Sequence, residues 1–370
     1  MARPSLWLRC ETKQFERRTA LTPDSAKKLV EAGFHVYVER DKQRIFKDAE
    51  YESVGCNLVD HSSWTTAPNS IPILGLKELP ESALPLTHDH IHFGHCYKKQ
   101  SGWSQHLARF YNGGGTLYDL EYLTDGQGRR VAAFGFHAGF AGAAVGALVF
   151  ASRRSNEGAV DAGELAPFES EEALVNEAKG RLGEKIRDVN VLVIGALGRC
   201  GRGAVDLFRR VGVNEENIKK WDMAETAQGG PFQEILDVDI FVNCIYLNLK
   251  IPPFTTNQFI AGAGQNRRLS VIVDVSCDTT NPFNPLPIYN ISTTFAKPTV
   301  LVDVGDGNPP LHVVSIDQLP SLVPREASHQ FSTDLLPSLL ELPSRRKSVV
   351  WLNAEKVFRE NIQLAVEIEG

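Results

Sequence analysis

The chain is poor in the features that mark several special classes of protein. Only six of its 370 residues are cysteines, and no two have zinc-finger or thioredoxin-type spacing, so we expect reduced thiols and no metal site. It has no excess of positive charge: 39 Lys and Arg face 45 Asp and Glu, a net charge of −6 that argues against nucleic acid as a partner. Hydrophobic residues make up 42 %, which excludes a disordered chain, and the length allows two or three domains.

Neither end of the chain carries a recognisable targeting signal. The first 18 residues reach charged side chains before any long apolar run, and the last four, EIEG, are not a peroxisomal tripeptide. We therefore expect a cytoplasmic protein, and we expect it to be a monomer that acts on small molecules.

One long run, 131–151, lacks charged residues and has small residues at G-x-x-x-G spacing, so by length it could span a bilayer. It is rich in Ala and Gly, which drive membrane insertion weakly, and it contains His137. No second such run exists. We therefore expect no membrane span here but a buried helix whose glycines let neighbouring backbone come close.

Short apolar segments alternate with helical patterns along most of the chain, which predicts an α/β fold with mainly parallel sheets. Thr22 and Pro23 begin a helix that Gly33 ends, and a strand at 35–39 completes the first βαβ unit. A second α/β domain begins near residue 189. Further strands are expected at 71–76, 90–94, 116–120, 189–194, 218–222, 239–246 and 270–276, and the closing helices near 328–341 and 353–366.

A glycine-rich turn follows the strand at 189–194. Gly195, Gly198 and Gly201 form a G-x-x-G-x-x-G variant of the dinucleotide fingerprint, with a helix after it and Asp222 about 20 residues further on. The glycines permit a tight turn and close approach of backbone N–H groups to a pyrophosphate. Asp222 would accept from a ribose hydroxyl and repel a 2′-phosphate, so we expect NAD rather than NADP. The alternative is an α/β turn that only looks similar.

Two polar residues follow apolar strands of the first domain. Lys77, beside Glu78, could act as a base in a dry cleft, although most lysines in such places are surface residues. His95 can change charge near neutral pH, which suits acid–base work. A metal site is disfavoured, because strand alternation places His88, His90 and His92 on the face opposite His95.

Two pairs of adjacent arginines could bind substrate carboxylates, because a guanidinium group can donate two parallel hydrogen bonds to one carboxylate. Arg18 precedes a helix N-terminus and Arg130 adjoins the glycine-rich apolar helix, whereas their neighbours Arg17 and Arg129 read from the residues alone as solvated surface. We also expect Cys200 and Cys244 to lie close together at the carboxyl edge of one sheet. They form either a disulfide under oxidation or two buried thiols.

The motifs together resemble one family. RCETKQFERRTALTP at 9–23 resembles the opening signature of the alanine dehydrogenase and transhydrogenase superfamily. Several further motifs are similar to fungal saccharopine dehydrogenases of the NAD-dependent, L-lysine-forming kind, and the match covers almost the whole chain. These motifs are GLKELPE, HFGHCYKKQSGW, GTLYDLEYL, GRRVAAFGFHAGFAGAA, GALGRCGRGA, QGGPF and SIDQLPSLVPREAS.

The resemblance implies two Rossmann-like domains around a central cleft, with a discontinuous catalytic domain at 1–130 plus 320–370 and an NAD-binding domain at 131–319. It implies the last step of lysine biosynthesis by the α-aminoadipate route, in which saccharopine, NAD and water give L-lysine, 2-oxoglutarate and NADH. In this family some members end in a peroxisomal tripeptide, which this chain lacks.

The resemblance also implies residue roles. Lys77 takes the proton from the secondary amine, His95 handles the water that hydrolyses the imine, and Glu78 and Glu121 tune these two groups. The residues implied to bind substrate are Arg18, Lys77, Gln100, Arg130 and Phe134. Those implied to bind NAD are Arg129, Leu197, Gly198, Arg199, Asp222, Thr226, Tyr246, Val275, Ile316, Asp317, Gln318 and Leu319. Two alternatives stay open: an alanine dehydrogenase-like enzyme, and a non-catalytic NAD-binding protein.

Overall fold

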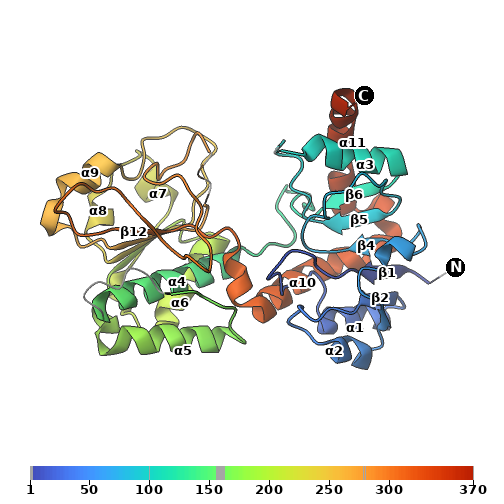
Figure 1. Ribbon diagram of the computed structural model, residues 1–370, viewed down its shortest axis with the longest axis horizontal. Helices are drawn as coiled ribbons and strands as arrows, with labels where there is room; N and C mark the ends of the chain where they lie inside the picture. Colours follow the sequence, from blue (N-terminus) through green and yellow to red (C-terminus); the bar gives the residue numbers. More distant parts are fainter. Residues whose placement is uncertain (1–2, 100, 156–162, 278, 280, 370) are drawn as a thin grey trace. The chain divides into compact units, whose positions relative to one another are not determined.

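The computed structural model describes residues 3–99, 101–155, 163–277, 279 and 281–369, which form two compact units (Figure 1). Unit 1 joins Met1–Ala133 to Arg325–Gly370, and unit 2 is Phe134–Pro324. The boundaries expected after residues 130 and 319 lie a few residues before the observed ones, which follow Ala133 and Pro324. Each unit contains a mainly parallel sheet with helices packed against it, so the predicted α/β class is confirmed.

Unit 1 is built on a parallel six-stranded sheet of order β3-β2-β1-β4-β5-β6. The chain starts in the middle at β1, extends the sheet to one side, and returns to place β4 on the other side of β1. Loops leaving the two central strands diverge at such a switch point and leave room for a ligand. The strands are β1 (Ser5–Leu8), β2 (His35–Glu39), β3 (Asn57–Val59), β4 (Ile73–Leu74), β5 (Asp89–His92) and β6 (Thr116–Asp119).

The first helix of unit 1 begins at the expected signals, whereas the two closing helices begin four residues earlier than expected, at Pro324 and Val349. Thr22 caps α1 by accepting a hydrogen bond from the Ser25 N–H, with Pro23 in the first turn. The closing helix α11 packs on α3 and β6, where Trp351 is fully buried. The helices are α1 (Pro23–Glu31), α2 (Asp48–Ser53), η1 (Trp64–Thr66), α3 (Trp103–Gly113), α10 (Pro324–Leu340), η6 (Leu342–Lys347) and α11 (Val349–Glu369).

Unit 2 has a second six-stranded sheet, of order β11-β12-β10-β9-β7-β8, parallel except for the β11–β12 pair. Its strands are β7 (Val191–Ile194), β8 (Ile218–Trp221), β9 (Ile240–Asn243), β10 (Val271–Asp274), β11 (Val300–Leu301) and β12 (His312–Val314). Its helices are α4 (Gly135–Ser155), α5 (Glu171–Leu182), η2 (Gly183–Asp188), α6 (Arg199–Val211), η3 (Glu215–Asn217), α7 (Met223–Thr226), α8 (Gln233–Leu236), α9 (Asn257–Gly262), η4 (Gly264–Asn266) and η5 (Leu319–Leu322).

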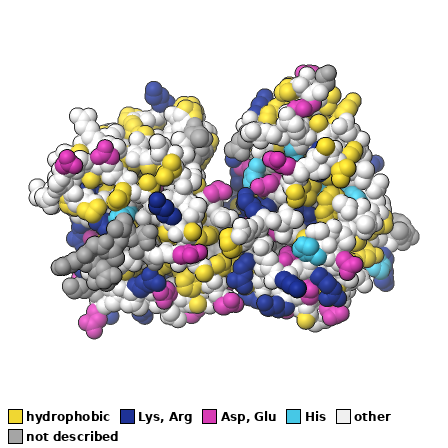
Figure 2. Space-filling model, viewed as in Figure 1, with side chains coloured by type: hydrophobic (Ala, Val, Ile, Leu, Met, Phe, Trp, Pro, Cys, Tyr) yellow, Lys and Arg dark blue, Asp and Glu magenta, His cyan; other side chains and the backbone are white. Residues whose placement is uncertain are grey.

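Alternate residues of the central strand β7 serve opposite faces of this sheet. Val191 and Val193 pack with α4, α5 and α6, which lie together on one face in Figure 1, whereas Leu192 and Ile194 pack with α8 and α9. Both faces are therefore covered, as the continuous apolar strands require. On the surface that Figure 2 shows, Lys and Arg are mixed with Asp and Glu on both units.

The uncharged run at 131–151 forms α4, the core helix of unit 2. Among the described residues it is the one helix long and apolar enough to cross a membrane, over Gly135–Arg154, and 78 % of that window is buried inside the protein. Glycines on α4 and α6 let these two helices cross closely. A Cβ on Gly139 of α4 would lie 1.8 Å from the Cys200 carbonyl oxygen, and a Cβ on Gly203 of α6 would lie 1.9 Å from the Phe136 carbonyl oxygen. The expected tightly packed, buried helix is confirmed.

Candidate active site

Lys77 lies in the loop after β4, three residues beyond Leu74, whereas we expected it at the end of the strand. The strand is only two residues long because the peptide N–H groups of Leu76 and Lys77 bond to the Glu11 carboxylate rather than to a neighbouring strand. The Lys77 side chain is partly buried. Burial acts to raise the pKa of the Glu16 carboxyl, but Arg18, and to a smaller degree the charge of Lys77, bring that pKa below its usual value. The Lys77 ammonium therefore lies within electrostatic reach of Glu16.

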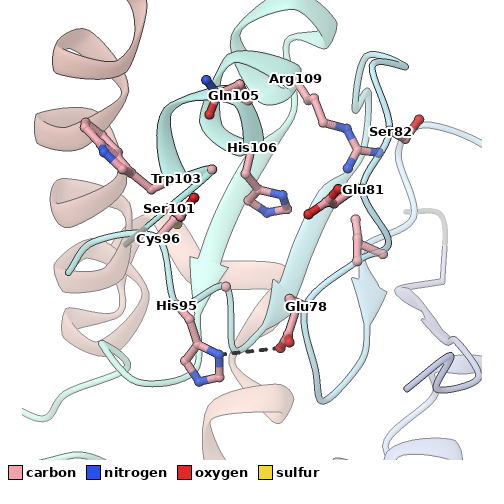
Figure 3. A pocket seen from close by; sticks show the side chains of 13 residues that line it. Glu78, Glu81, Ser82, His95, Cys96, Ser101, Trp103, Gln105, His106 and Arg109 are labelled. Atoms are coloured by element: carbon pink, nitrogen blue, oxygen red, sulfur yellow. Dashed lines mark ion pairs between the residues drawn. The ribbon is translucent and has the colours of Figure 1, made fainter. Parts of the chain in front are cut away.

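His95 and Glu78 both line a cavity of about 480 Å³ in unit 1 and lie in contact with each other (Figure 3). His95 Nδ1 lies 3.4 Å from Glu78 Oε2, and about 40 % of each side chain is exposed. The contact with His95, with help from Lys13, holds the pKa of the Glu78 carboxyl well below its usual range. His106, Gln105 and Arg109 line the same cavity. Glu78 was expected to tune one of the two proposed catalytic groups, and the group that it contacts is His95.

The backbone at His95 has a left-handed conformation, with φ of 52°, which is uncommon for a residue other than glycine. Buried Asp119, the last residue of β6, supports this turn: its Oδ2 accepts from the Gly94 N–H at 3.1 Å and its Oδ1 from the Glu121 N–H at 2.9 Å. Burial raises the pKa of Asp119 to about 6. Asp119 was not predicted from the sequence, in which a charged residue at a strand end looks like solvated surface.

The three other histidines of the THDHIHFGH segment share one face, as alternation predicts. The rings of His88 and His90 lie 6.1 Å apart and those of His90 and His92 5.8 Å apart, all buried. Among the described residues, no group of three or more His, Cys, Asp and Glu is arranged to hold a metal ion. His95 lies beyond the strand, away from this stack.

The two arginines expected at substrate carboxylates already hold carboxylates of the chain. Arg18 is buried and forms a fork with Glu16, with Nε–Oε1 at 2.8 Å and Nη2–Oε2 at 2.6 Å. Arg130 is half-exposed and pairs with Glu121, which also lies 3.2 Å from Lys98 Nζ. Any substrate carboxylate would therefore share or replace these contacts.

The remaining residues expected near the substrate are spread over both units. Gln100 lies outside the described residues. Phe134 is the first residue of unit 2, one residue before α4 begins. Arg129, expected at the cofactor, is a residue of unit 1 whose guanidinium pairs with Asp125 at 2.9 Å.

The glycine-rich turn of unit 2 has the geometry that a dinucleotide requires. Gly195 has φ of 85°, and a Cβ on Gly201 would lie 2.1 Å from the Gly195 carbonyl oxygen, so the turn closes directly against α6. Gly198 precedes the first turn of α6 and provides no side-chain cap, which leaves backbone N–H groups to meet an anion. Asp222, directly after β8, accepts from the Leu197 N–H at 3.0 Å. These residues fit NAD.

The other residues expected at the cofactor lie on loops that follow the strands of unit 2. Tyr246, like Leu197, is well exposed, at 61 % and 76 %. Buried Thr226 donates to the Asp222 carbonyl at 2.9 Å. The side chains of Ile316 and Leu319 lie in the core, so a cofactor there would meet backbone, or the intervening Asp317 and Gln318. Val275 follows β10 and packs towards α4, and Arg199 begins α6.

Cys200 and Cys244 lie within electrostatic reach of each other, since the charge of a Cys200 thiolate contributes to the pKa of Cys244. Burial first, and Cys200 second, raise that pKa well above its usual value. Both are free thiols of intermediate burial in this structure, and a disulfide under oxidation stays a prediction.

Comparisons with known proteins place the chain in a family. The model of the alanine dehydrogenase/PNT N-terminal domain matches residues 7–141. Among solved structures, an L-alanine dehydrogenase has a TM-score of 0.65 at 16 % identity, covering 96 % of this chain and 94 % of that one. A transhydrogenase from Sinorhizobium meliloti has a TM-score of 0.58 at 18 % identity, covering 91 % and 94 %. These two likenesses show the fold.

Full-length relatives show the family itself. Saccharopine dehydrogenase [NAD(+), L-lysine-forming] of Yarrowia lipolytica is 54 % identical over 96 % of this chain and 97 % of its own. The enzymes of the same name from Neurospora crassa and Schizosaccharomyces pombe are 53 % and 50 % identical, each over 98 % of this chain and over 97 % and 100 % of their own. The chain therefore belongs to the family of NAD-dependent, L-lysine-forming saccharopine dehydrogenases.

Proposed function

We propose that this protein oxidises saccharopine with NAD⁺ and water to L-lysine and 2-oxoglutarate, with Lys77 as the base and His95 as the group that handles water. The observation that carries the proposal is the identity of 50–54 % with enzymes of that name over nearly the whole chain. Lys77 and His95 follow the neighbouring strands β4 and β5 of one sheet, which places both at the carboxyl edge where ligands bind.

The chain's own groups match the order of proton transfers that this reaction needs. The carbon of the secondary amine can lose hydride only as its nitrogen gains a free electron pair, so a base must first remove a proton from that nitrogen. Lys77 is the proposed acceptor of this proton, which it takes in its neutral form. Bound NAD⁺ supplies the hydride acceptor.

Hydrolysis of the resulting imine is assigned to His95. Its ring can take a proton from the attacking water and return one to the leaving amine as the carbon–nitrogen bond breaks, leaving 2-oxoglutarate and lysine. The Glu78 carboxylate lies 3.4 Å from Nδ1, where it can orient the ring. Arg18 and Arg130 are the proposed partners of substrate carboxylates.

The substrate assignment is tested by following NADH formation with saccharopine and, separately, with L-alanine. We expect turnover with saccharopine and none with alanine. Turnover with alanine alone would assign the chain to the alanine dehydrogenase activity, and no turnover with either, despite NADH binding, would favour a cofactor-binding protein without catalysis.

A further inference from the structure

The segment that follows β1 contains a buried ion pair that contacts the backbone of Lys77. Arg9 and Glu11 are 2 % and 8 % exposed, and Arg9 Nη1 lies 3.5 Å from Glu11 Oε2. Removing two charges from water costs free energy that their attraction does not always return. A buried pair of this kind is better explained by what its hydrogen bonds hold in place than by a gain in stability.

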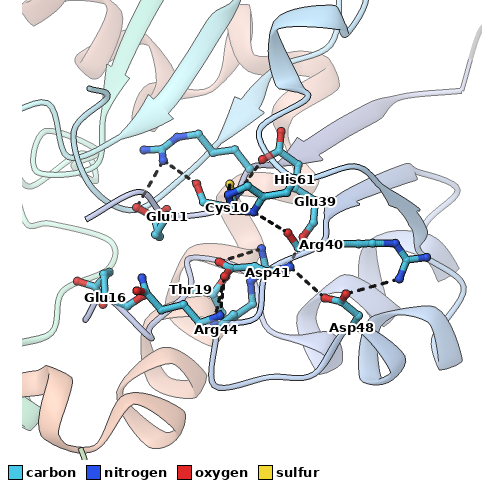
Figure 4. Close-up of polar contacts among 12 residues, drawn as sticks. Cys10, Glu11, Glu16, Thr19, Glu39, Arg40, Asp41, Arg44, Asp48 and His61 are labelled. Carbon is cyan, nitrogen blue, oxygen red and sulfur yellow. Dashed lines mark hydrogen bonds and ion pairs between the residues drawn. The ribbon is translucent and has the colours of Figure 1, made fainter. Parts of the chain in front are cut away.

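What the pair holds is the backbone of Lys77. Glu11 Oε1 accepts from the Leu76 N–H at 2.7 Å and Glu11 Oε2 accepts from the Lys77 N–H at 2.9 Å. Arg9 Nη2 donates to the Lys77 carbonyl oxygen, and Arg9 Nη1 donates to the Cys10 carbonyl oxygen at 3.0 Å. The peptide groups on both sides of Lys77 are therefore bound to the two halves of one ion pair, part of which Figure 4 shows.

Gly75 makes room for this arrangement. A Cβ on Gly75 would lie 2.2 Å from Arg9 Nε, 2.4 Å from Cζ and 2.6 Å from Nη2, so any side chain there would displace the guanidinium. Gly75 has no positive φ, and its backbone conformation is open to other residues. The glycine is needed for space, two residues before Lys77.

We propose that Arg9 and Glu11 are positioning residues that hold the Lys77 backbone so that its amine reaches the substrate nitrogen, and that Gly75 admits them. This inference rests on the proposed role of Lys77 as the base. Lys77 lies beyond the last paired residue of β4, so the strand ladder does not hold it, whereas a proton transfer needs its donor and acceptor within hydrogen-bond reach.

The chain offers a matched control in Glu39, on the adjacent strand β2. Glu39 is also a fully buried carboxylate that accepts from backbone N–H groups, those of Cys10, Ser62 and Trp64, at 2.8, 3.1 and 2.6 Å. Its hydrogen bonds hold the exit of β1 and the segment after β3 (Figure 4). Glu39→Gln therefore reports the cost of losing a buried carboxylate from this sheet without removing a hydrogen bond to the Lys77 peptide.

The experiment compares Glu11→Gln with Glu39→Gln for kcat, KM, NADH affinity and thermal midpoint. Both should lower the midpoint. Glu11→Gln alone should lower kcat, by ~10–100-fold, the scale of a small displacement of a catalytic group, with KM for saccharopine and NADH affinity little changed. Gly75→Ala, which keeps both charged residues, should lower kcat in the same way and serves if Glu11→Gln does not fold.

A double variant separates positioning from general damage. If Glu11 acts through Lys77, adding Glu11→Gln to Lys77→Met should produce no further loss of kcat. Two outcomes would overturn this inference and leave the proposed function intact. One is that Glu11→Gln lowers kcat by the same factor in the parent protein and in Lys77→Met. The other is that Glu11→Gln and Gly75→Ala keep a normal kcat although Lys77→Met has lost turnover. If Lys77→Met itself keeps normal turnover, the proposed role of Lys77 fails and this inference fails with it.

Discussion

Each unit has a six-stranded, mainly parallel sheet, but the two sheets differ in strand order and in what they bury. In unit 2 the central strands VLVI, IFVN and VIVD bury mainly aliphatic side chains, and the expected cofactor turn is formed largely by backbone. In unit 1 the sheet and the segments that follow its strands bury Arg9, Glu11, Glu39 and Asp119 and three histidines packed edge to face. A site made of backbone N–H groups needs only glycine and a helix end, whereas a site made of reactive side chains needs buried polar groups to hold them.

The largest effect that tests this comparison is on turnover. Lys77→Met and His95→Gln should each lower kcat with saccharopine by ~10²–10⁴-fold, the usual range for an acid–base group. Together they should lose less than the product of the two, because both handle protons of one reaction. Arg40→Gln is the control: this exposed side chain of unit 1 pairs with Asp48 and should keep normal turnover. A fully multiplicative loss would mean that the two groups act independently.

One added methyl group should disrupt the glycine-rich turn of unit 2, where the expected cofactor contacts come largely from the backbone. Gly201→Ala would place a Cβ 2.1 Å from the Gly195 carbonyl oxygen, so the turn must open, and we expect NADH to bind ~100-fold more weakly, a loss of about 2.7 kcal/mol. Gly180→Ala on α5 is the matched control, since nothing lies within 4 Å of its added Cβ and NADH affinity should not change. Titration of NADH fluorescence measures both. Unchanged affinity in Gly201→Ala would place the cofactor elsewhere.

The polar core of unit 1 should make its stability depend on pH. Burial lowers the pKa of His90 and His92 well below the usual value, and that of His106 to about 4. The unfolded chain takes up these protons below about pH 6.5, so the histidine contribution to stability is full above that pH and falls on acidification, by up to ~1.4 kcal/mol per pH unit for each histidine. The raised pKa of Asp119 offsets part of this loss below about pH 6, because the folded state holds that proton more tightly.

Urea unfolding followed by tryptophan fluorescence measures this dependence, because every tryptophan except Trp221 belongs to unit 1. His90 lies among the rings of Trp64, Phe110 and two histidines, and neither of its ring nitrogens has a hydrogen-bond partner among the residues that the structure describes. His90→Phe should therefore flatten the profile between pH 6.5 and 4. An unfolding free energy that is independent of pH in the parent protein would contradict the buried neutral state.

The smallest effect concerns cofactor choice. Asp222→Asn keeps a side-chain acceptor near the Leu197 N–H but removes the charge that would repel a 2′-phosphate. We expect NAD to bind a few-fold less well and the preference for NAD over NADP to narrow by ~10-fold, or about 1.4 kcal/mol. Steady-state kinetics with both cofactors measure this. An unchanged preference would show that another residue selects NAD.

Local patterns in the sequence were sufficient for most of the fold. The helix signals at Thr22 and Pro23, the glycine-rich turn at Gly195 and the buried helix α4 each depend on neighbours within one or two turns, and each is where it was predicted. The ends of β4 and β5 were placed too late. Strand length depends on which distant groups take the backbone hydrogen bonds, and a single sequence does not show this.

The supports of the candidate site were missed for the same reason. Glu11 reaches Leu76 and Lys77 across 65 and 66 positions, and Asp119 reaches Gly94 across 25. As charged residues near strand ends, they look in the sequence like solvated surface, the usual place for such side chains. Only the pairing of β1 with β4, and of β5 with β6, makes them buried partners of the loops that hold Lys77 and His95.

We assign cofactor binding to unit 2 and acid–base chemistry to unit 1. This assignment is tested most directly in the double variant Lys77→Met/His95→Gln, by measuring NADH affinity and saccharopine turnover on the same preparation. Because the cofactor residues of the glycine-rich turn all belong to unit 2, we predict that NADH affinity stays at the parent value while turnover falls by at least ~10²-fold. Near-normal turnover, or a loss of NADH affinity as large as the loss of turnover, would contradict the account.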